Sequence, residues 1–151
     1  MILVNPFEAP IELDDLIRIE REAYPSAFQM MQGFDSWEDV ATYSEVPLGR
    51  LVVLSDGRSW YAIIAKHRFG RAEFVDLAKT PGSPTIDWLF IVRALRTVGV
   101  RRLYFDARES TSYQRFLQQL ELLKGAGVKV AKDKTFIDER GETMHAMVVK
   151  L

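Results

Sequence analysis

Three predicted β-strands follow one another directly in the middle of this 151-residue sequence, and segments of helical spacing lie on both sides of them. Short turns at Asp56–Gly57 and at Gly70 separate the strands, which read RLVVLS (50–55), SWYAIIAKHRF (59–69) and RAEFVDLAK (71–79). Strands joined by such short turns pair in an antiparallel manner. The chain must therefore build its fold around a central antiparallel meander.

Helices and further strands are predicted before and after this meander. A strand (2–5) and two helices (13–24 and 36–44) precede it, and a helix (84–98), a strand (101–107), a helix (113–124) and a closing hairpin (128–138 and 142–151) follow it. The predicted order is β-α-α-β-β-β-α-β-α-β-β. We therefore expect one α/β domain over residues 1–151, with a mixed, mostly antiparallel sheet flanked by helices.

The composition excludes several classes of function. The chain has no cysteine, so disulfides, thiolate nucleophiles and cysteine metal sites are absent, and two histidines do not predict a metal site. A formal charge of -1, from 20 basic and 21 acidic residues, favours neither a nucleic acid nor a membrane as partner. Since no apolar run approaches the ~20 residues of a membrane span, and no signal-peptide pattern is visible, we expect a soluble, cytoplasmic protein.

The loop AKTPGSPTIDW (78–88) separates the third strand of the meander from the next predicted helix. If Ser83 caps this helix and Pro84 occupies its first position, free backbone N–H groups and the positive end of the helix dipole face outward. Such a position suits an anion. The alternative is a helix start that binds no ligand.

Three segments, in this order, carry a resemblance to a known family: IEREAYP (19–25), LVVLSDGRSWYAI (51–63) and AEFVDLAKTP (72–81). Together with the element order, they resemble the Gcn5-related N-acetyltransferase (GNAT) superfamily over nearly the whole chain. The resemblance implies acetyl-CoA as co-substrate. It also implies direct transfer of an acetyl group to an amine, either of a small molecule or of a protein. The resemblance is also compatible with a homo-oligomer.

The resemblance also implies a binding site for acetyl-CoA. The backbone of Leu77, Ala78 and Lys79 would contact the pantetheine arm, and Gly82, Ser83 and Thr85 would form the phosphate site. The pyrophosphate loop of the family reads Arg or Gln, two residues, Gly, one residue, and Gly or Ala. This chain has Lys79, Gly82 and Pro84 at that spacing, and Pro84 lacks the backbone donor of the residue it replaces.

Two residues are candidates for catalysis. The string AEFV resembles the strand whose glutamate is the general base in relatives, so Glu73 is the predicted base, with a pKa raised by burial. Leu122 and Leu123 stand where a tyrosine general acid is expected, and Tyr113 is the predicted substitute. Glu73 as a solvent-facing residue and Tyr113 as a core residue are the structural alternatives. Asp76 would orient an amine or cap the strand.

Two other functions remain open from the sequence. The altered loop and the missing tyrosine favour a catalytically inactive GNAT-like scaffold, a protein-binding or assembly module similar to some phage-encoded virion proteins. A nucleic-acid-binding domain would use Arg93, Arg96, Arg101 and Arg102, with Lys66 and Arg68. Finally, the apolar segment FQMMQGF (28–34) lies where relatives close over their substrate, or it is an ordinary packed loop.

Overall fold

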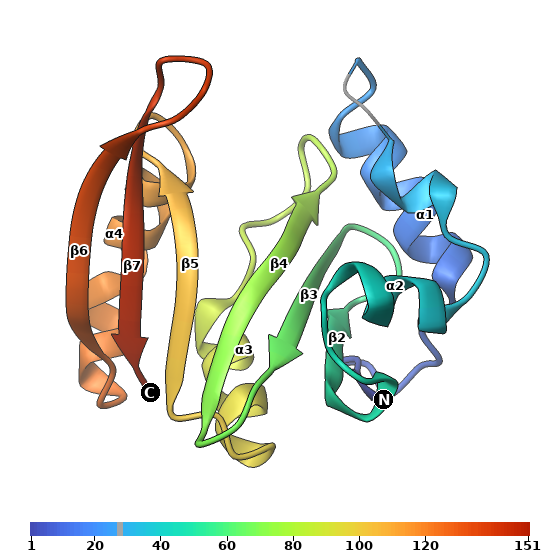
Figure 1. The fold of residues 1–151 in the computed structure, drawn as a ribbon, viewed down its shortest axis with the longest axis horizontal. Coiled ribbons are helices and arrows are strands. Elements are labelled where there is room, and N and C mark those ends of the chain that lie inside the picture. The colour runs from blue at the N-terminus through green and yellow to red at the C-terminus, as the bar shows by residue number, and fades with distance from the viewer. Residues whose placement is uncertain (27–28) are drawn as a thin grey trace. The chain divides into compact units, whose positions relative to one another are not determined.

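A computed structural model describes residues 1–26 and 29–151 of the chain, so Phe28 of the apolar segment lies outside the described residues. The elements follow the predicted order (Figure 1): β1 (Ile2–Val4), α1 (Leu13–Ala23), η1 (Met30–Gly33), α2 (Trp37–Tyr43), η2 (Leu48–Arg50), β2 (Leu51–Ser55), β3 (Trp60–Lys66), β4 (Arg71–Lys79), α3 (Trp88–Thr97), β5 (Arg102–Arg108), α4 (Ser112–Gly125), β6 (Lys129–Ile137) and β7 (Thr143–Lys150). Among the described residues, no helix is long and apolar enough to span a bilayer.

The described strands form one mixed sheet in the order β1-β2-β3-β4-β5-β7-β6. β1 runs parallel to β2 and β4 parallel to β5, whereas β2–β3, β5–β7 and β6–β7 are antiparallel. The predicted fold class is therefore confirmed. Internal contacts divide the chain into two compact units that share β4: unit 1 (Met1–His67 and Phe74–Ile86) and unit 2 (Arg68–Glu73 and Asp87–Leu151). The prediction of a single domain stays a prediction.

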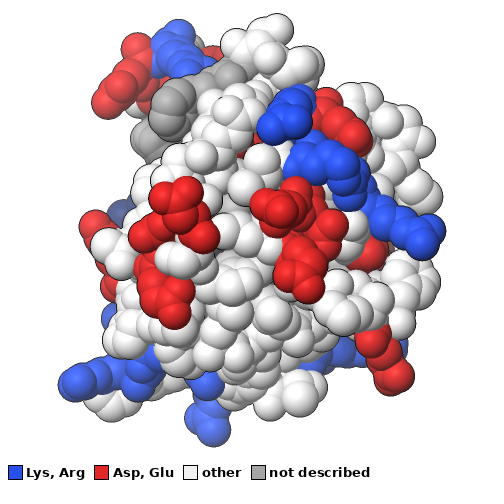
Figure 2. All heavy atoms as spheres, turned by 90° about the vertical axis from the view of Figure 1, so that its right-hand side faces the viewer, with Lys and Arg blue, Asp and Glu red and all other residues white. Residues whose placement is uncertain are grey.

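Unit 1 has an apolar core between α1, α2 and its strands. The buried face of α1 carries Leu16, Ile19 and Glu20, at the spacing of one side of a helix. β2 is buried along its whole length, and Val53, Tyr61 and Ile63 of β2 and β3 pack against α1. Outside the core, acidic side chains form several groups on the face shown in Figure 2, the side on which Figure 1 shows α1 and α2.

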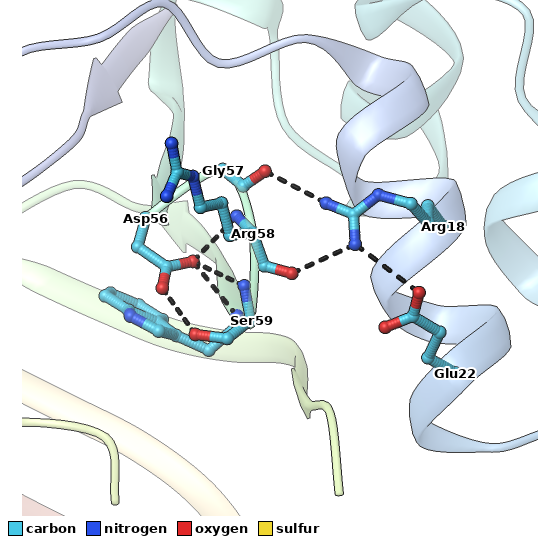
Figure 3. A network of polar contacts seen from close by, with 7 residues as sticks. Arg18, Glu22, Asp56, Gly57, Arg58 and Ser59 are labelled. Carbon is cyan, nitrogen blue, oxygen red and sulfur yellow. Dashed lines mark hydrogen bonds and ion pairs between the residues drawn. The ribbon is translucent and has the colours of Figure 1, made fainter. Parts of the chain in front are cut away.

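A polar network ties α1 to the turn between β2 and β3 (Figure 3). The Arg18 guanidinium donates to the carbonyl oxygens of Arg58 and Gly57, each at 3.0 Å, and lies 3.6 Å from Glu22. Asp56 accepts hydrogen bonds from the backbone N–H groups of the turn and from the Ser59 hydroxyl. Burial opposes its ionisation, but these hydrogen bonds outweigh burial and lower the pKa of Asp56. The turn is therefore held by groups of the chain itself.

Unit 2 packs α3 and α4 against one face of its strands. Figure 1 shows α4 behind β5, β7 and β6. An aromatic cluster joins these elements: the ring of Phe116 on α4 lies 5.4 Å from Phe105 on β5 and 5.5 Å from Trp88 on α3. Leu103 and Val149 are buried on the same face of the strands. The opposite face of these strands carries charged side chains, among them Arg102 and Lys150.

The start of α3 differs from the prediction. The helix begins at Trp88, not at Pro84, and Asp87 is the N-cap in place of Ser83. The Asp87 carboxylate accepts hydrogen bonds from the N–H groups of Leu89 and Phe90 at 2.9 and 3.3 Å. The Ser83 hydroxyl lies four residues before this N-cap and instead donates to the carbonyl of Thr80 at 2.6 Å, within the loop. The predicted helix start was therefore wrong by one turn.

Candidate active site

Four polar side chains form a cluster inside unit 1, which we call the polar cluster: Glu20 of α1, Tyr24 at its C-cap, Tyr61 of β3 and Asp76 of β4. The Tyr61 hydroxyl donates to Oδ2 of Asp76 at 2.6 Å, and the Tyr24 hydroxyl donates to the carbonyl of Leu77 at 3.1 Å. Tyr61 is fully buried, Glu20 is buried, Asp76 is half-buried and Tyr24 is exposed. The cluster therefore extends from the core of unit 1 to its surface.

Local sequence places Glu20 and Tyr24 in this cluster. Glu20 lies one helical turn after Leu16 and one turn before Tyr24, so the three side chains share a side of α1. The Glu20 carboxylate accepts a hydrogen bond from the backbone N–H of Met31 at 2.8 Å. This bond satisfies a carboxylate in the core, and it fixes the η1 segment to α1.

Burial raises the pKa of both carboxyl groups in the polar cluster. For Asp76, burial outweighs the hydrogen bonds from the Tyr61 hydroxyl and the Leu77 N–H, so its pKa is raised. For Glu20, burial is again the largest cause, the Met31 N–H opposes it, and the nearby charge of Asp76 adds to it. Burial also raises the pKa of Tyr61, so its hydroxyl remains protonated and donates to Asp76. A carboxyl group with a raised pKa is better matched to proton transfer near neutral pH.

The predicted cofactor-binding residues lie at the end of β4 and in the loop after it, in unit 1. Ala78 is buried, and Leu77 contacts the polar cluster through both its N–H and its carbonyl. The Lys79 ammonium donates to the Ser83 carbonyl at 2.8 Å and lies 3.5 Å from the Ser83 hydroxyl. Within residues 1–26 and 29–151, Lys79 forms no ion pair, so its charge is not neutralised by a carboxylate.

Comparison with known proteins identifies the fold. The sequence matches no protein-family model, and no curated protein sequence matches it significantly. Among solved structures, the ribosomal-protein-S18-alanine N-acetyltransferase from Escherichia coli has a TM-score of 0.58 at 17% identity, over 94% of this chain and 90% of that one. The corresponding Brucella melitensis enzyme has a TM-score of 0.58 at 12% identity, over 92% and 94%. An acetyltransferase-fold protein from Salmonella typhimurium, solved with acetyl-CoA, has a TM-score of 0.55 at 14% identity, over 93% and 90%.

The chain has the GNAT fold. The residues predicted to hold the phosphates of acetyl-CoA have one feature that suits an anion. The half-buried Lys79 ammonium is held in place by the oxygens of Ser83 and has no acidic partner in the described part of the chain. Gly82 has φ +76°, and a Cβ built on it would meet no atom within 4 Å, so this glycine permits the turn and leaves room beside it.

The start of α3 fits an anion less well than the sequence indicated. Three N–H groups at its first turn have acceptors inside the chain. Trp88 N–H donates to the side-chain oxygen of Gln119 at 3.2 Å, and Leu89 and Phe90 donate to Asp87. A carboxylate of the chain itself therefore occupies the position at which a helix would bind phosphate.

The two predicted catalytic residues, Glu73 and Tyr113, belong to unit 2. Glu73 is exposed and is the register partner of Tyr104 on β5. Its charge contributes, after burial, to raising the pKa of Asp106. The Tyr113 hydroxyl donates to Asp133 at 2.7 Å, and its ring stacks on His145. That hydrogen bond is the main cause of the raised pKa of Tyr113.

The polar cluster contains residues that the sequence analysis did not select as a site. Glu20 had one visible signal, because it is a charged residue at an apolar position of the α1 pattern. Asp76 was considered only for orienting an amine or capping its strand. Nothing in the local sequence indicates that Tyr61 reaches Asp76, because the two residues belong to different strands.

Proposed function

We propose that this chain is an acetyl-CoA-dependent N-acetyltransferase in which Asp76 accepts the proton of the amine. The observation that carries the proposal is the Asp76 carboxyl itself, half-buried at the end of β4, with a raised pKa and a hydrogen bond from Tyr61. An amine attacks only as the neutral base, so a nearby carboxylate that takes its proton promotes the reaction. Tyr61 orients the Asp76 carboxyl by its hydrogen bond.

Binding of acetyl-CoA is assigned to the end of β4 and the following loop. Leu77, Ala78 and Lys79 would hold the pantetheine arm, and Gly82, Ser83 and Thr85, with the Lys79 ammonium, would hold the phosphates. Acetyl-CoA would supply an acetyl group activated as a thioester. The support for this assignment is the GNAT fold and a half-buried lysine whose charge no carboxylate neutralises in the described residues.

The acceptor is proposed to be a cationic amine. Apart from the buried Glu20, α1 and α2 carry five acidic residues and two basic ones, and Figure 2 shows several acidic groups, with some basic ones beside them, on this face. A surface of this charge raises the local concentration of cations. Small-molecule amines and the N-terminus of a peptide both fit this description.

Two matched variants test the base. We expect Asp76→Asn to lower kcat/KM at least a hundredfold, the usual contribution of a general base, and Glu73→Gln to change it less than threefold. The assay measures release of the CoA thiol with spermidine, an amino sugar and a short peptide with a free N-terminus as acceptors. The reverse pattern would refute the role of Asp76 and support Glu73, the base predicted from the sequence.

Calorimetric titration tests the binding of acetyl-CoA separately from catalysis. We expect Lys79→Glu to weaken binding about tenfold or more, because it replaces a charge-assisted hydrogen bond with a repulsion. Lys66→Glu makes the same charge change at the end of β3 and is the control. If acetyl-CoA does not bind at millimolar concentration, the alternative of an inactive scaffold with a protein partner replaces the proposal.

The general acid predicted from the sequence, Tyr113, is tested by Tyr113→Phe. An acid that protonates the leaving thiolate contributes about a hundredfold to kcat. A variant that loses stability but keeps kcat would show that the Tyr113 hydroxyl serves only to bind Asp133.

A further inference from the structure

A row of four basic residues crosses four adjacent strands of unit 2. Arg71 of β4 is the register partner of Arg102 of β5, Arg102 is the partner of Lys150 of β7, and Lys150 is the partner of Lys129 of β6. Residues directly opposite each other in neighbouring strands project from the same face of a sheet. With strands about 4.8 Å apart, this basic row is roughly 14 Å long.

Interactions inside the protein do not account for the basic row. Like charges directly opposite each other destabilise a sheet. All four residues are exposed, and among residues 1–26 and 29–151 none of them forms an ion pair. In the described part of the chain, Arg71 alone of the four has an aromatic contact, with its guanidinium carbon 5.0 Å from the centre of the Tyr104 ring. The row therefore costs stability and leaves its charges available to a ligand.

Two further lysines of β6 extend the positive face. Lys132 and Lys134 are the register partners of Val148 and Ala146. These two residues lie two and four positions before Lys150 in β7, so they project from the same face as Lys150. The intervening residue, Asp133, faces the other way, because its carboxylate binds Nδ1 of His145 at 2.7 Å. Glu73 and Asp106 are also on the positive face, two or more residues farther along their strands from the basic row.

An exposed aromatic residue lies beside the basic row. Phe69, in the turn before β4, is 93% exposed and has φ +62°, a conformation that costs a bulky residue about 1–2 kcal/mol. The Gly70 carbonyl accepts hydrogen bonds from the N–H groups of Arg101 and Arg102 at 2.7 and 3.0 Å, which fixes the turn next to Arg102. Phe69 buries almost no surface in the fold, so its ring is free to contact a ligand.

The charge of the two units is unequal. Unit 2 contains 14 basic and 9 acidic residues, a formal charge of +5, whereas unit 1 contains 6 basic and 12 acidic residues, a charge of -6. These values sum to the -1 of the whole chain. The positive face therefore belongs to a unit whose long-range field also attracts anions.

We propose that this face of unit 2 binds single-stranded nucleic acid, with phosphates along the basic row and a base stacked on Phe69. Proteins that bind single strands combine a line of cations along the backbone with aromatic rings on which bases stack. An acidic protein partner would use the cations but would have no use for the isolated flat ring of Phe69. The inference does not depend on acetyltransferase activity.

Fluorescence anisotropy with labelled twelve-nucleotide oligo(dT) and oligo(U) tests the proposal on the full chain. We expect a Kd of about 1–100 µM at physiological salt. The slope of log K against log salt should be about -3, because each of four phosphate contacts contributes about -0.7 for a single strand. Comparison of the two oligonucleotides distinguishes DNA from RNA as the preferred strand.

Two variants and a control assign the binding to this face. Arg102→Glu should weaken binding about tenfold and make the salt slope less steep, whereas Arg115→Glu, the same change on the exposed side of α4, should leave both unchanged. Phe69→Asn removes the ring and suits the positive φ, so it should weaken binding about tenfold without lowering the melting temperature.

Three results would overturn the proposal. The first is the absence of an anisotropy change at 50 mM salt, where phosphate contacts are strongest. The second is equal binding by Arg102→Glu and Arg115→Glu. The third is displacement of the oligonucleotide by polyglutamate together with unchanged binding by Phe69→Asn, which would indicate an acidic protein as the partner of this face.

Discussion

Tyr61→Phe removes one hydroxyl from the polar cluster and tests how much this hydroxyl stabilises the ionised carboxyl of Asp76. The Asp76 carboxyl has two donors, the Tyr61 hydroxyl at 2.6 Å and the Leu77 N–H at 2.9 Å, and the variant removes the shorter bond. A hydrogen bond to a charged group contributes about 1.5–3 kcal/mol, and one between neutral groups about 1 kcal/mol. The ionised form of Asp76 therefore loses about 1 kcal/mol more than the neutral form, which raises its pKa further, by about one unit.

The sign of the pH dependence follows from the raised pKa of Asp76. The pKa of Asp76 is higher in the folded state than in the unfolded chain. Such a carboxyl group contributes most to the free energy of unfolding below the ordinary pKa of aspartate, and this contribution is lost as the pH rises through its folded-state pKa. Tyr61→Phe should therefore lower the free energy of unfolding by about 1 kcal/mol at pH 4 and by about 2 kcal/mol at pH 8.

Urea unfolding, followed by tryptophan fluorescence from pH 4 to pH 8, measures this difference. Tyr43→Phe is the control, because Tyr43 is 54% exposed on α2 and lies against Phe34 by its ring. An equal loss of stability at both pH values would show that the Tyr61 hydroxyl does not contact an ionised carboxyl. In the acetyltransferase assay, the acidic limb of the kcat/KM profile should move to higher pH by the same unit.

Two further predictions concern unit 2. Asp87→Ala should lower the free energy of unfolding by about 1 kcal/mol, the usual cost of an N-cap, while Asp87→Ser should restore most of it in the same urea titration. Burial opposes protonation of His145, but the carboxylates of Asp133 and Glu109 outweigh burial and raise the pKa of His145. Protonated His145 should therefore stabilise the fold by about 1 kcal/mol. This stabilisation should be full below pH ~6.5 and be lost as the pH rises through the pKa of His145 in the folded state. His145→Gln should abolish this loss between pH 6 and pH 9, whereas His67→Gln should retain it.

The element order was predictable because each element has its own local signal. The turn at Gly70 and the alternation in RAEFVDLAK determine where β4 begins, whatever the rest of the chain does. The start of α3 was not predictable in this way, because Ser83 and Asp87 are both good N-caps. The choice between them depends on the Thr80 carbonyl and the Lys79 ammonium, which bind the oxygens of Ser83 and are contacts of the folded loop.

The candidate site was less predictable than the fold, because its chemistry depends on burial and on pairs of distant residues. Glu73 and Asp76 lie in the same strand, and the sequence alone favoured Glu73 by resemblance. In the structure Glu73 is exposed, and Asp76 is the residue that meets a buried tyrosine from β3. The pKa of a carboxyl group depends on such an environment, so a local motif could not decide between the two.

The basic row could not be predicted from the sequence, because only the register of the strands brings its four residues together. Arg71, Arg102, Lys129 and Lys150 are spread over eighty positions, and a net charge of -1 gave no reason to group them. Pairing β4 with β5, β5 with β7 and β7 with β6 aligns all four on one face. A near-neutral protein can therefore carry a strongly positive surface, and its affinity for anions depends on that surface and not on the total. If the salt slope of oligonucleotide binding is near zero, the alignment has no electrostatic consequence and this reasoning fails.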